Sequence, residues 1–326
     1  MSSESASSAV QISTGARLHF GPLAYSPSHG RHFGGIGLMI DHPGWSIEAR
    51  PATGNNVDTV TGFEVERVRQ VLQRFRERAL PAWQPAPVEL VVKSAIPSHH
   101  GLGSGTQLTL AIGECLSRLA GACVDTVGMA RQLGRGVRSA IGIYGYDSGG
   151  FLVDAGQIQP GELGDLSCRV AVPEPWRFVL VFPEEGAGLS GEAETQVLRE
   201  LAPMSDIVAG RLSRLTLTEM LPALHQSDCP RFAAAVEEYG RLVGEFFRPV
   251  QGDVFAHPAM AELAERLRQD GISGMAQSSW GPTLAVPLAS GDDAAALCDR
   301  IRKISRQSVT CQIVASLNRG RAIHVD

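Results

Sequence analysis

The sequence lacks long hydrophobic runs and any excess of basic charge. No uncharged apolar stretch reaches the ~20 residues that a membrane-spanning helix requires, so we expect no membrane partner. Aspartate and glutamate (34) outnumber lysine and arginine (29), for a net charge of −5. Binding to nucleic acid would favour a basic face, so nucleic acid is not an expected partner either. Residues 1–8 lack the basic and apolar regions of a signal peptide, and we expect a disordered tail over residues 1–12.

Paired cysteines are also missing. None of the six cysteines forms a CxxC spacing, which argues against a zinc site, and most lie in apolar runs. Buried free thiols are therefore expected rather than disulfides. This pattern suits a reducing cytoplasm, the location we expect. The cysteines are Cys115, Cys123, Cys168, Cys229, Cys298 and Cys311.

Strand-like and helix-like segments are mixed along the chain without regular alternation. This order favours an α+β fold over a doubly wound parallel sheet. A chain of 326 residues is long enough for two modest domains. Pro173-Glu174-Pro175 marks a candidate boundary. We therefore expect an N-terminal domain over residues 13–172 and a C-terminal domain over residues 173–326.

Hydrophobic periodicity places the individual elements. Over 64–80, apolar residues recur at helical spacing with arginines between them, so Arg74, Arg76 and Arg78 are expected on a solvated face. The glycine-dense segment 134–142 and the turn-rich segment 155–166 carry no predicted helix or strand. Helices are expected at 64–80, 104–119, 126–133, 191–202, 205–225, 230–247, 257–269 and 292–305. Strands are expected at 16–20, 35–40, 45–49, 88–92, 150–154, 178–182, 310–314 and as a pair within 275–286.

The most informative segment is the glycine-rich loop Pro97–Gln107, between the strand at 88–92 and the helix from 104. The first N–H groups of a helix have no partner within it, and the helix dipole places positive charge there. Gly101, Gly103 and Gly105 allow unusual backbone angles and close approach of a bulky anion. The loop therefore predicts an anion site, with phosphate as the expected ligand.

The loop also allows an interpretation without a ligand. Ser104 and Gln107 have the S-x-x-Q spacing of a capping box, which needs no ligand. The loop is neither a Walker A motif, because the GK[ST] ending is missing, nor a Rossmann fingerprint, because the glycines are wrongly spaced.

The segment Pro97–Ser104 resembles the second motif of the GHMP kinase superfamily, whose loop wraps a nucleotide's phosphates. Kinases of that group commonly carry an aspartate after a Ser-Gly pair in their next conserved segment, where this chain has Arg138-Ser139-Ala140-Ile141-Gly142. The loop ending Gly105-Thr106-Gln107 departs from the kinase pattern as well. A kinase mechanism would lack its usual base here.

Five blocks, in the same order, are similar to the β-ribofuranosylaminobenzene 5′-phosphate synthase branch of that superfamily. The similarity runs from about residue 15 to the end and is more specific than the glycine loop alone. The blocks are Arg17–Gly21, Gly101–Gln107, Gly134–Gly142, Gly149–Asp154 and Gln277–Thr283.

This resemblance implies a two-domain GHMP kinase-like fold, with a ribosomal S5 domain 2-like N-terminal domain and a ferredoxin-like C-terminal domain. It implies a decarboxylating pentosyltransferase of methanopterin biosynthesis. Such an enzyme joins phosphoribosyl pyrophosphate to 4-aminobenzoate or 4-hydroxybenzoate and releases carbon dioxide and diphosphate. No organic cofactor is expected, Mg²⁺ remains an option, and a homodimer is left open.

The expected site combines cationic groups with the glycine loop, because diphosphate and the 5′-phosphate must both be held. Arg135 and Arg138 lie among glycines, which favours a binding role over that of exposed surface arginines. The loop at 278–281 is expected to approach the substrate, with a structural turn as the alternative. The candidate catalytic residues are Arg17, His19, Arg135, Arg138 and Ser139. The candidate substrate- and phosphate-binding residues are Gly101, Leu102, Gly103, Ser104, Gly105, Thr106, Ser278, Ser279 and Gly281.

Other polar residues are weaker candidates. Asp154 is considered as a ligand for Mg²⁺ on diphosphate, against a plain turn residue. His29 and His32 have a metal-like spacing, but no cysteine or acid lies near them, so zinc is disfavoured. Lys93 is equally compatible with a phosphate contact and with a solvated strand end. The rival functions are an ATP-dependent small-molecule kinase and a non-catalytic nucleotide-binding protein of the same fold.

Overall fold

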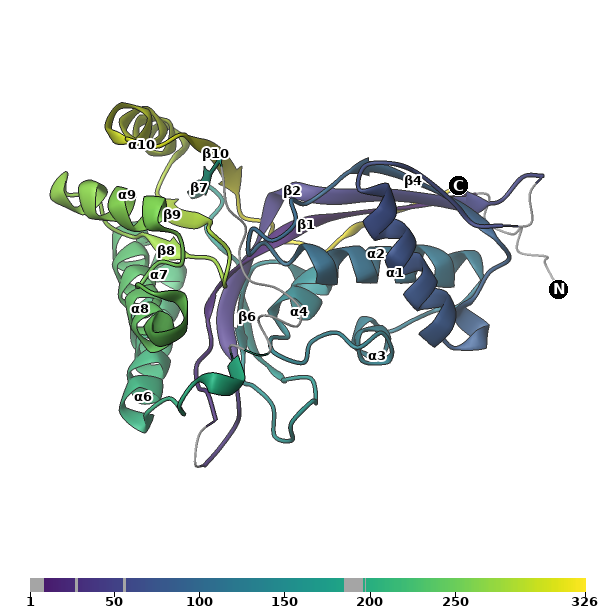
Figure 1. The fold of residues 1–326 in the computed structure, drawn as a ribbon, viewed down its shortest axis with the longest axis horizontal. Helices are drawn as coiled ribbons and strands as arrows, with labels where there is room; N and C mark the ends of the chain where they lie inside the picture. The colour runs from purple at the N-terminus through teal and green to yellow at the C-terminus, as the bar shows by residue number, and fades with distance from the viewer. Residues whose placement is uncertain (1–8, 27–28, 55–56, 185–195, 197) are drawn as a thin grey trace.

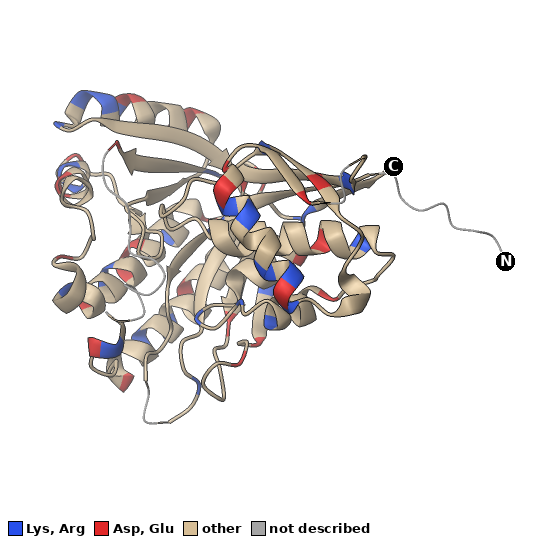
Figure 2. Ribbon diagram, turned by 45° about the vertical axis from the view of Figure 1, so that its right-hand side comes forward, with Lys and Arg blue, Asp and Glu red and all other residues tan. Residues whose placement is uncertain are grey.

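The computed structural model describes the chain except residues 1–8, 27–28, 55–56, 185–195 and 197. Its elements form two β-sheets, each covered by helices (Figure 1). Within the described residues, no helix combines the length and the apolar character needed to cross a bilayer. Lysine and arginine are interspersed with aspartate and glutamate along the helices in the view of Figure 2.

The first sheet has seven described strands, and all of them except β11 come from the first half of the chain or directly after it. The strands are β1 (Val10–Gly21), β2 (Gly35–Pro51), β3 (Thr59–Gly62), β4 (Val88–Ser94), β5 (Phe151–Asp154), β6 (Leu166–Val170) and β11 (Ala322–Val325). Their order is β11-β1-β2-β4-β3, with β5 paired to β2 and β6 to β5. The accompanying helices are α1 (Val65–Arg78), the 3₁₀ turn η1 (Pro81–Trp83), α2 (Ser104–Leu119), α3 (Thr126–Gln132) and α4 (Ile141–Ser148). Helices α2 and α4 pack against β1 and β2 (Figure 1).

The second sheet has four strands in the order β10-β7-β9-β8. They are β7 (Arg177–Pro183), β8 (Ala276–Gln277), β9 (Leu284–Leu288) and β10 (Val309–Ala315). The helices of this part are α6 (Asp206–Arg214), the π-helical turn η2 (Leu215–Met220), α7 (Leu221–Gln226), α8 (Cys229–Gln251), α9 (Pro258–Gln269) and α10 (Gly291–Ile304). Among the described strands, β3 and β4 alone pair in parallel. Mainly antiparallel sheets with separate groups of helices confirm the predicted α+β class.

Most predicted elements are present, with informative differences. The amphipathic pattern of 64–80 is helix α1, which buries Val68, Leu72 and Phe75. The two strands predicted within 35–49 form one 17-residue strand, β2. Half of the predicted helix at 191–202 lies outside the described residues, and residues 196 and 198–200 are helical. One helix, α4, and three strands, β3, β6 and β11, were not predicted. The expected tail over residues 1–12 is too long, because β1 begins at Val10 and pairs with β2 and β11 from there.

One hydrophobic core extends through both parts of the molecule. Phe232 of α8 packs against Phe151 of β5 and Trp176, with ring centroids 5.8 Å and 5.3 Å away. Strand β11 pairs with β1, which brings the C-terminal residues back to the first sheet. The division into 13–172 and 173–326 stays a prediction, since the chain after residue 315 returns to the first part.

Candidate functional site

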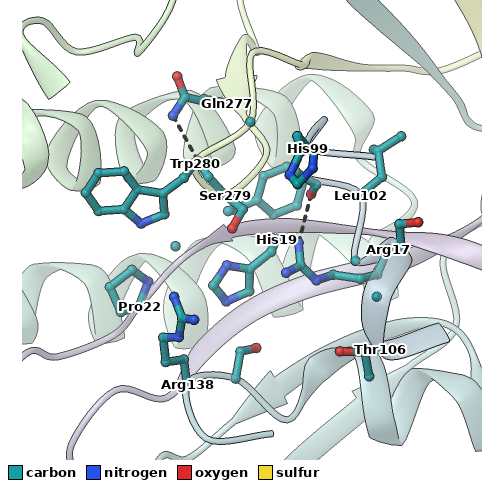
Figure 3. Close-up of a pocket in the computed structure, with 18 of the residues that line it drawn as sticks. Arg17, His19, Pro22, His99, Leu102, Thr106, Arg138, Gln277, Ser279 and Trp280 are labelled. Carbon is teal, nitrogen blue, oxygen red and sulfur yellow. Dashed lines mark hydrogen bonds between the residues drawn. The ribbon is translucent and has the colours of Figure 1, made fainter. Parts of the chain in front are cut away.

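A cavity of about 420 Å³ lies where the two parts meet. It is bounded by the glycine loop, the end of β1, the segment 134–139, one face of α8 and the loop at 279–281 (Figure 3). Cavities of this size accommodate small molecules. Segments far apart in the sequence therefore form one site.

The glycine loop turns sharply into α2. Gly103, with φ of 71°, precedes the helix, and no side chain caps the helix start. The hydroxyl of Ser104 donates to the carbonyl of Ile96 at 2.8 Å, and the amide of Gln107 donates to the carbonyl of Gly142 at 2.6 Å. The alternative of a Ser104–Gln107 capping box is therefore wrong. The start of the helix faces the cavity without a side-chain cap, as an anion site requires.

The second part of the chain holds this loop directly. Ser278 donates to the carbonyl of Gly101 at 2.8 Å, and Thr283 donates to the carbonyl of His100 at 2.6 Å. A Cβ atom at Gly101 would lie 1.9 Å from the carbonyl oxygen of Ser278. Glycine is thus required at 101 by the close approach of two backbones as well as by its φ of 73°.

Ser278 does not contact the cavity, contrary to its predicted binding role. Its side chain is fully buried, and its oxygen also accepts the N–H of His19 at 3.2 Å. Ser279 and Gly281 do line the cavity. Ser278 therefore positions the loop, while Ser279 and Gly281 face the cavity.

Strand β1 carries Arg17 and His19 into the cavity (Figure 3). The backbone N–H of Arg17 donates to the carbonyl of Leu102 at 3.1 Å, and its guanidinium donates to the carbonyl of Gly101 at 2.9 Å. The imidazole of His19 is 8% exposed. Burial, and secondly the charge of Arg17, hold the pKa of His19 well below its ordinary value. The imidazole is therefore neutral at neutral pH.

Two further arginines flank the start of α2. Arg135 donates to the carbonyl of Gly105 and to the hydroxyl of Thr109, both at 2.8 Å. Burial, and then the charges of Arg74, Arg67 and Arg138, lower the pKa of Arg135 to about 10. Arg67 of α1 donates to the hydroxyls of Ser98 and Ser104 at 2.6 Å and 2.9 Å. Its pKa is lowered by burial too.

Arg67 is a site residue that was not predicted from the sequence. It lies one helical turn before Val71, at the border of the apolar face of α1, whereas the arginines considered there lie farther along the helix. Of those, Arg76 is not freely solvated: it forms a salt bridge with Asp58 at 2.7 Å.

The charge balance of the cavity is one-sided. Among the described residues, its lining contains no aspartate or glutamate. Arg138 and Ser139 complete the cationic side, just before α4, where the Ser139 hydroxyl accepts the N–H of Ile141 at 3.3 Å. Neighbouring cations without a carboxylate favour a ligand that carries several negative charges. The arginines that line the cavity are Arg17, Arg67, Arg135 and Arg138.

Asp154 is not placed to hold a metal ion, contrary to the prediction. Its buried carboxylate accepts the backbone N–H groups of Ala140 at 2.7 Å and Gly156 at 2.8 Å. It therefore fixes the start of α4 and does not line the cavity. The part of the chain that the structure describes has no cluster of three or more His, Cys, Asp and Glu side chains suited to a metal.

Two other weak candidates lie away from the cavity. Lys93 pairs with Glu48 at 2.6 Å, as a solvated strand end would. His32 accepts the N–H of Ser26 at 2.8 Å, which uses its Nδ1 within its own loop.

The opposite wall of the cavity is apolar. Phe247 of α8 and Trp280 pack together with ring centroids 4.6 Å apart. Both rings line the cavity and are 7% exposed. From the sequence, the loop at 278–281 is expected to approach the substrate, with a structural turn as the alternative, but neither Trp280 nor Phe247 is predicted as a binding residue. The site thus joins a cationic half to an aromatic half. The apolar side chains of that half are Phe20, Pro22, Phe33, Leu198, Val243, Phe247, Val254 and Trp280.

Comparison with protein families gives two matches. Residues 66–147 match the GHMP kinases N terminal domain, and residues 220–306 match the GHMP kinases C terminal model. Together these matches span just over half of the chain and include the glycine loop, α4 and α8.

Curated relatives match over most of the chain. A beta-ribofuranosylphenol 5'-phosphate synthase from Methanothermobacter thermautotrophicus is 27% identical over 289 residues, covering 84% of this chain and 87% of the relative. The protein of the same name from Archaeoglobus fulgidus is 29% identical over 258 residues, covering 72% and 80%.

Solved structures show the same fold at low sequence identity. A homoserine kinase from Cytophaga hutchinsonii superposes with a TM-score of 0.66 at 15% identity, over 99% of this chain and all of that one. A mevalonate pyrophosphate decarboxylase from Streptococcus pyogenes gives a TM-score of 0.65 at 12% identity, over 95% and 98%. The predicted two-domain kinase-like fold is confirmed.

Proposed function

The chain belongs to the GHMP kinase superfamily, and from this premise we propose that it is an enzyme that transfers phosphoribosyl from phosphoribosyl pyrophosphate to a 4-substituted benzoate with loss of carbon dioxide. The observation that carries this proposal is the cavity itself. Four arginines line one half without a carboxylate among the described lining residues, and aromatic side chains line the other. A polyanion and an aromatic acid meet those two requirements together.

The reaction balances without an oxidant or a strong base. The bond between ribose C1 and the diphosphate oxygen breaks, the diphosphate keeps the electron pair, and positive charge develops at C1. The ring carbon that bears the carboxylate bonds to C1. The bond to the carboxyl carbon then breaks, its electrons restore the aromatic ring, and carbon dioxide leaves.

The residues of the cationic half have separate tasks in this reaction. Arg17, Arg67 and Arg135 surround the start of α2, where a phosphate group also meets backbone N–H groups. Fixed donors of this kind stabilise the leaving diphosphate without reorganisation. His19 is neutral, so it adds no positive charge beside the developing cation at C1.

Mg²⁺ would enter this site on the substrate. The chain offers no carboxylate among the described residues of the lining, and Asp154 is engaged by backbone N–H groups. The oxygens of the diphosphate are then the ligands available to the ion.

One assay tests the proposal. The protein is incubated with phosphoribosyl pyrophosphate, Mg²⁺ and carboxyl-labelled 4-aminobenzoate or 4-hydroxybenzoate, without ATP, and released carbon dioxide is counted. We expect release that depends on both substrates. ATP hydrolysis without label release would favour the kinase alternative. Binding of substrate without turnover of either kind would favour the non-catalytic alternative. Both acceptors are tested, because the names of the relatives refer to a phenol.

A further inference from the structure

The aromatic half of the cavity is built mainly by the second part of the chain. Gly240, Val243, Gly244 and Phe247 are spaced so that they share one face of α8, and all four line the cavity. Trp280 closes this face from the loop after β8, and its ring packs on Phe247. This wall carries no charged side chain among its described members, in contrast to the half formed by the glycine loop.

The wall is held in place from both ends. Gln277 donates to the carbonyl of Ser279 at 2.8 Å and accepts the N–H of Ala256 at 2.7 Å, which fixes the loop that carries Trp280. At the other end, a Cβ atom at Gly21 would lie 2.5 Å from Val243, so β1 is in direct contact with α8. The aromatic pair is therefore preorganised beside the end of β1 that presents His19.

We propose that Phe247 and Trp280 form the subsite for the benzoate ring, and that they determine specificity for an aromatic acceptor. The inference deepens the proposed function and rests on it. A planar ring against this wall gains contact with two rings that are already ordered, so little side-chain entropy is lost on binding. Its carboxylate-bearing carbon then faces the cationic half, where ribose C1 lies once the diphosphate is bound.

The aromatic wall also protects the reaction at ribose C1. Phe247 and Trp280 keep water away from the cationic ribose carbon by the same packing. Water would otherwise compete as a nucleophile.

The test compares Phe247→Leu with Phe232→Leu. Phe247 lines the cavity, whereas Phe232 lies nearer the start of the same helix, packs on Trp176 with centroids 5.3 Å apart and is not a lining residue. Both changes remove a ring and keep a similar apolar volume. We expect Phe247→Leu to raise KM for the benzoate roughly three- to tenfold, the range for loss of an aromatic pair, with KM for phosphoribosyl pyrophosphate unchanged. Phe232→Leu should leave both KM values unchanged.

Binding of 4-aminobenzoate, measured by calorimetry with and without phosphoribosyl pyrophosphate, separates this inference from the proposed function. If the wild-type protein shows no turnover yet binds 4-aminobenzoate, and only Phe247→Leu weakens that binding, the subsite stands and the reaction is wrong. If turnover occurs and the two variants raise KM for the benzoate equally, the subsite is wrong and the reaction stands. Failure of the wild-type protein to bind 4-aminobenzoate in either condition would overturn the inference. Displacement of bound 4-aminobenzoate by adenosine would overturn it too.

Discussion

Ser278 donates a 2.8 Å hydrogen bond to the carbonyl of Gly101, 177 residues earlier in the chain. The same oxygen accepts the N–H of His19 at 3.2 Å. One buried hydroxyl thus joins β1, the glycine loop and the loop after β8. The cationic and aromatic halves of the cavity keep their spacing through this contact.

Replacing Ser278 with alanine should weaken both the fold and the reaction. The N–H of His19 and the carbonyl of Gly101 lose a buried partner, which costs roughly 1–3 kcal/mol. We expect a lower midpoint in urea and a lower kcat/KM for both substrates. Ser305→Ala is the control, because its exposed hydroxyl bonds only to the carbonyl of Gln307. Equal midpoints for the two variants would contradict the role given to Ser278.

Gly101→Ala tests the contact between the two loops from the other side. Alanine at this position meets strain from the positive φ and a carbonyl oxygen 1.9 Å from its Cβ. Gly161 has a similar φ of 88°, but no atom lies within 4 Å of a Cβ there. Gly161→Ala therefore measures the backbone strain alone, about 1–2 kcal/mol. We expect Gly101→Ala to destabilise more in urea and to abolish turnover; similar values for the two alanine variants would argue against a tight contact.

The glycine loop was predictable from the sequence because its backbone conformation depends on the glycines within the loop itself. Gly101 and Gly103 both adopt left-handed angles, which the run of glycines already indicated. The start of α4 was not predictable. Its position depends on the carboxylate of Asp154, on strand β5, which accepts the N–H of Ala140. Glycine-dense residues before it gave no local helix signal.

The contacts between side chains that are far apart in the chain could not be predicted from the sequence either. Arg67 is one of several arginines on α1, and only its contacts with Ser98 and Ser104 distinguish it. Strand β11 is four exposed residues that pair with β1, so its sequence carries no buried pattern. Ser278 was placed in the correct loop but on the wrong side of it, because the direction of one hydroxyl is set by packing.

Arg135→Lys should weaken binding of diphosphate while the protein remains folded. The guanidinium reaches the carbonyl of Gly105 and the hydroxyl of Thr109 at once, and a lysine ammonium does not reproduce this planar geometry. We expect diphosphate to raise the melting temperature of the wild-type protein, with affinity reduced about tenfold in the variant, as for loss of one charge-assisted bond. Arg69→Lys, at an exposed position on α1, is the control. Unchanged diphosphate affinity in Arg135→Lys would show that Arg135 has only a structural role.

The buried imidazole of His19 predicts a pH-dependent stability. Its pKa in the folded protein lies well below the ordinary value of 6.5, because burial and then Arg17 disfavour the cation. The unfolded chain therefore binds the proton first as pH falls, and the free energy of unfolding decreases below about pH 6.5. Above that pH the contribution is fully retained. His19→Asn should reduce the loss of stability between about pH 6.5 and 5, followed by urea titration, whereas His225→Asn, on the exposed side of α7, should not. Parallel pH profiles for the wild-type protein and His19→Asn would contradict the assignment.

The C-terminal strand should depend on the buried carboxylate of Glu114. Arg321, just before β11, donates to both oxygens of Glu114 at 2.9 Å, and Tyr146 adds a bond of 2.7 Å. Burial by itself would raise the pKa of Glu114, but the bonds from Arg321, Tyr146 and Arg118 outweigh it and hold the pKa below its ordinary value.

Glu114→Gln removes one of the two carboxylates that pair with Arg321, because Asp147 still contacts its guanidinium, and it also removes the charged partner of Arg118. We expect the loss of these charge-assisted bonds to lower the free energy of unfolding by about 1.5–3 kcal/mol and to speed amide exchange of β11. Turnover at low temperature should persist, since Glu114 does not line the cavity. Glu66→Gln, with a side chain 76% exposed on α1, controls for loss of one negative charge. If both variants unfold at the same urea concentration, the carboxylate does not anchor the strand; loss of turnover in folded Glu114→Gln would instead show that the return of β11 to the first sheet shapes the site.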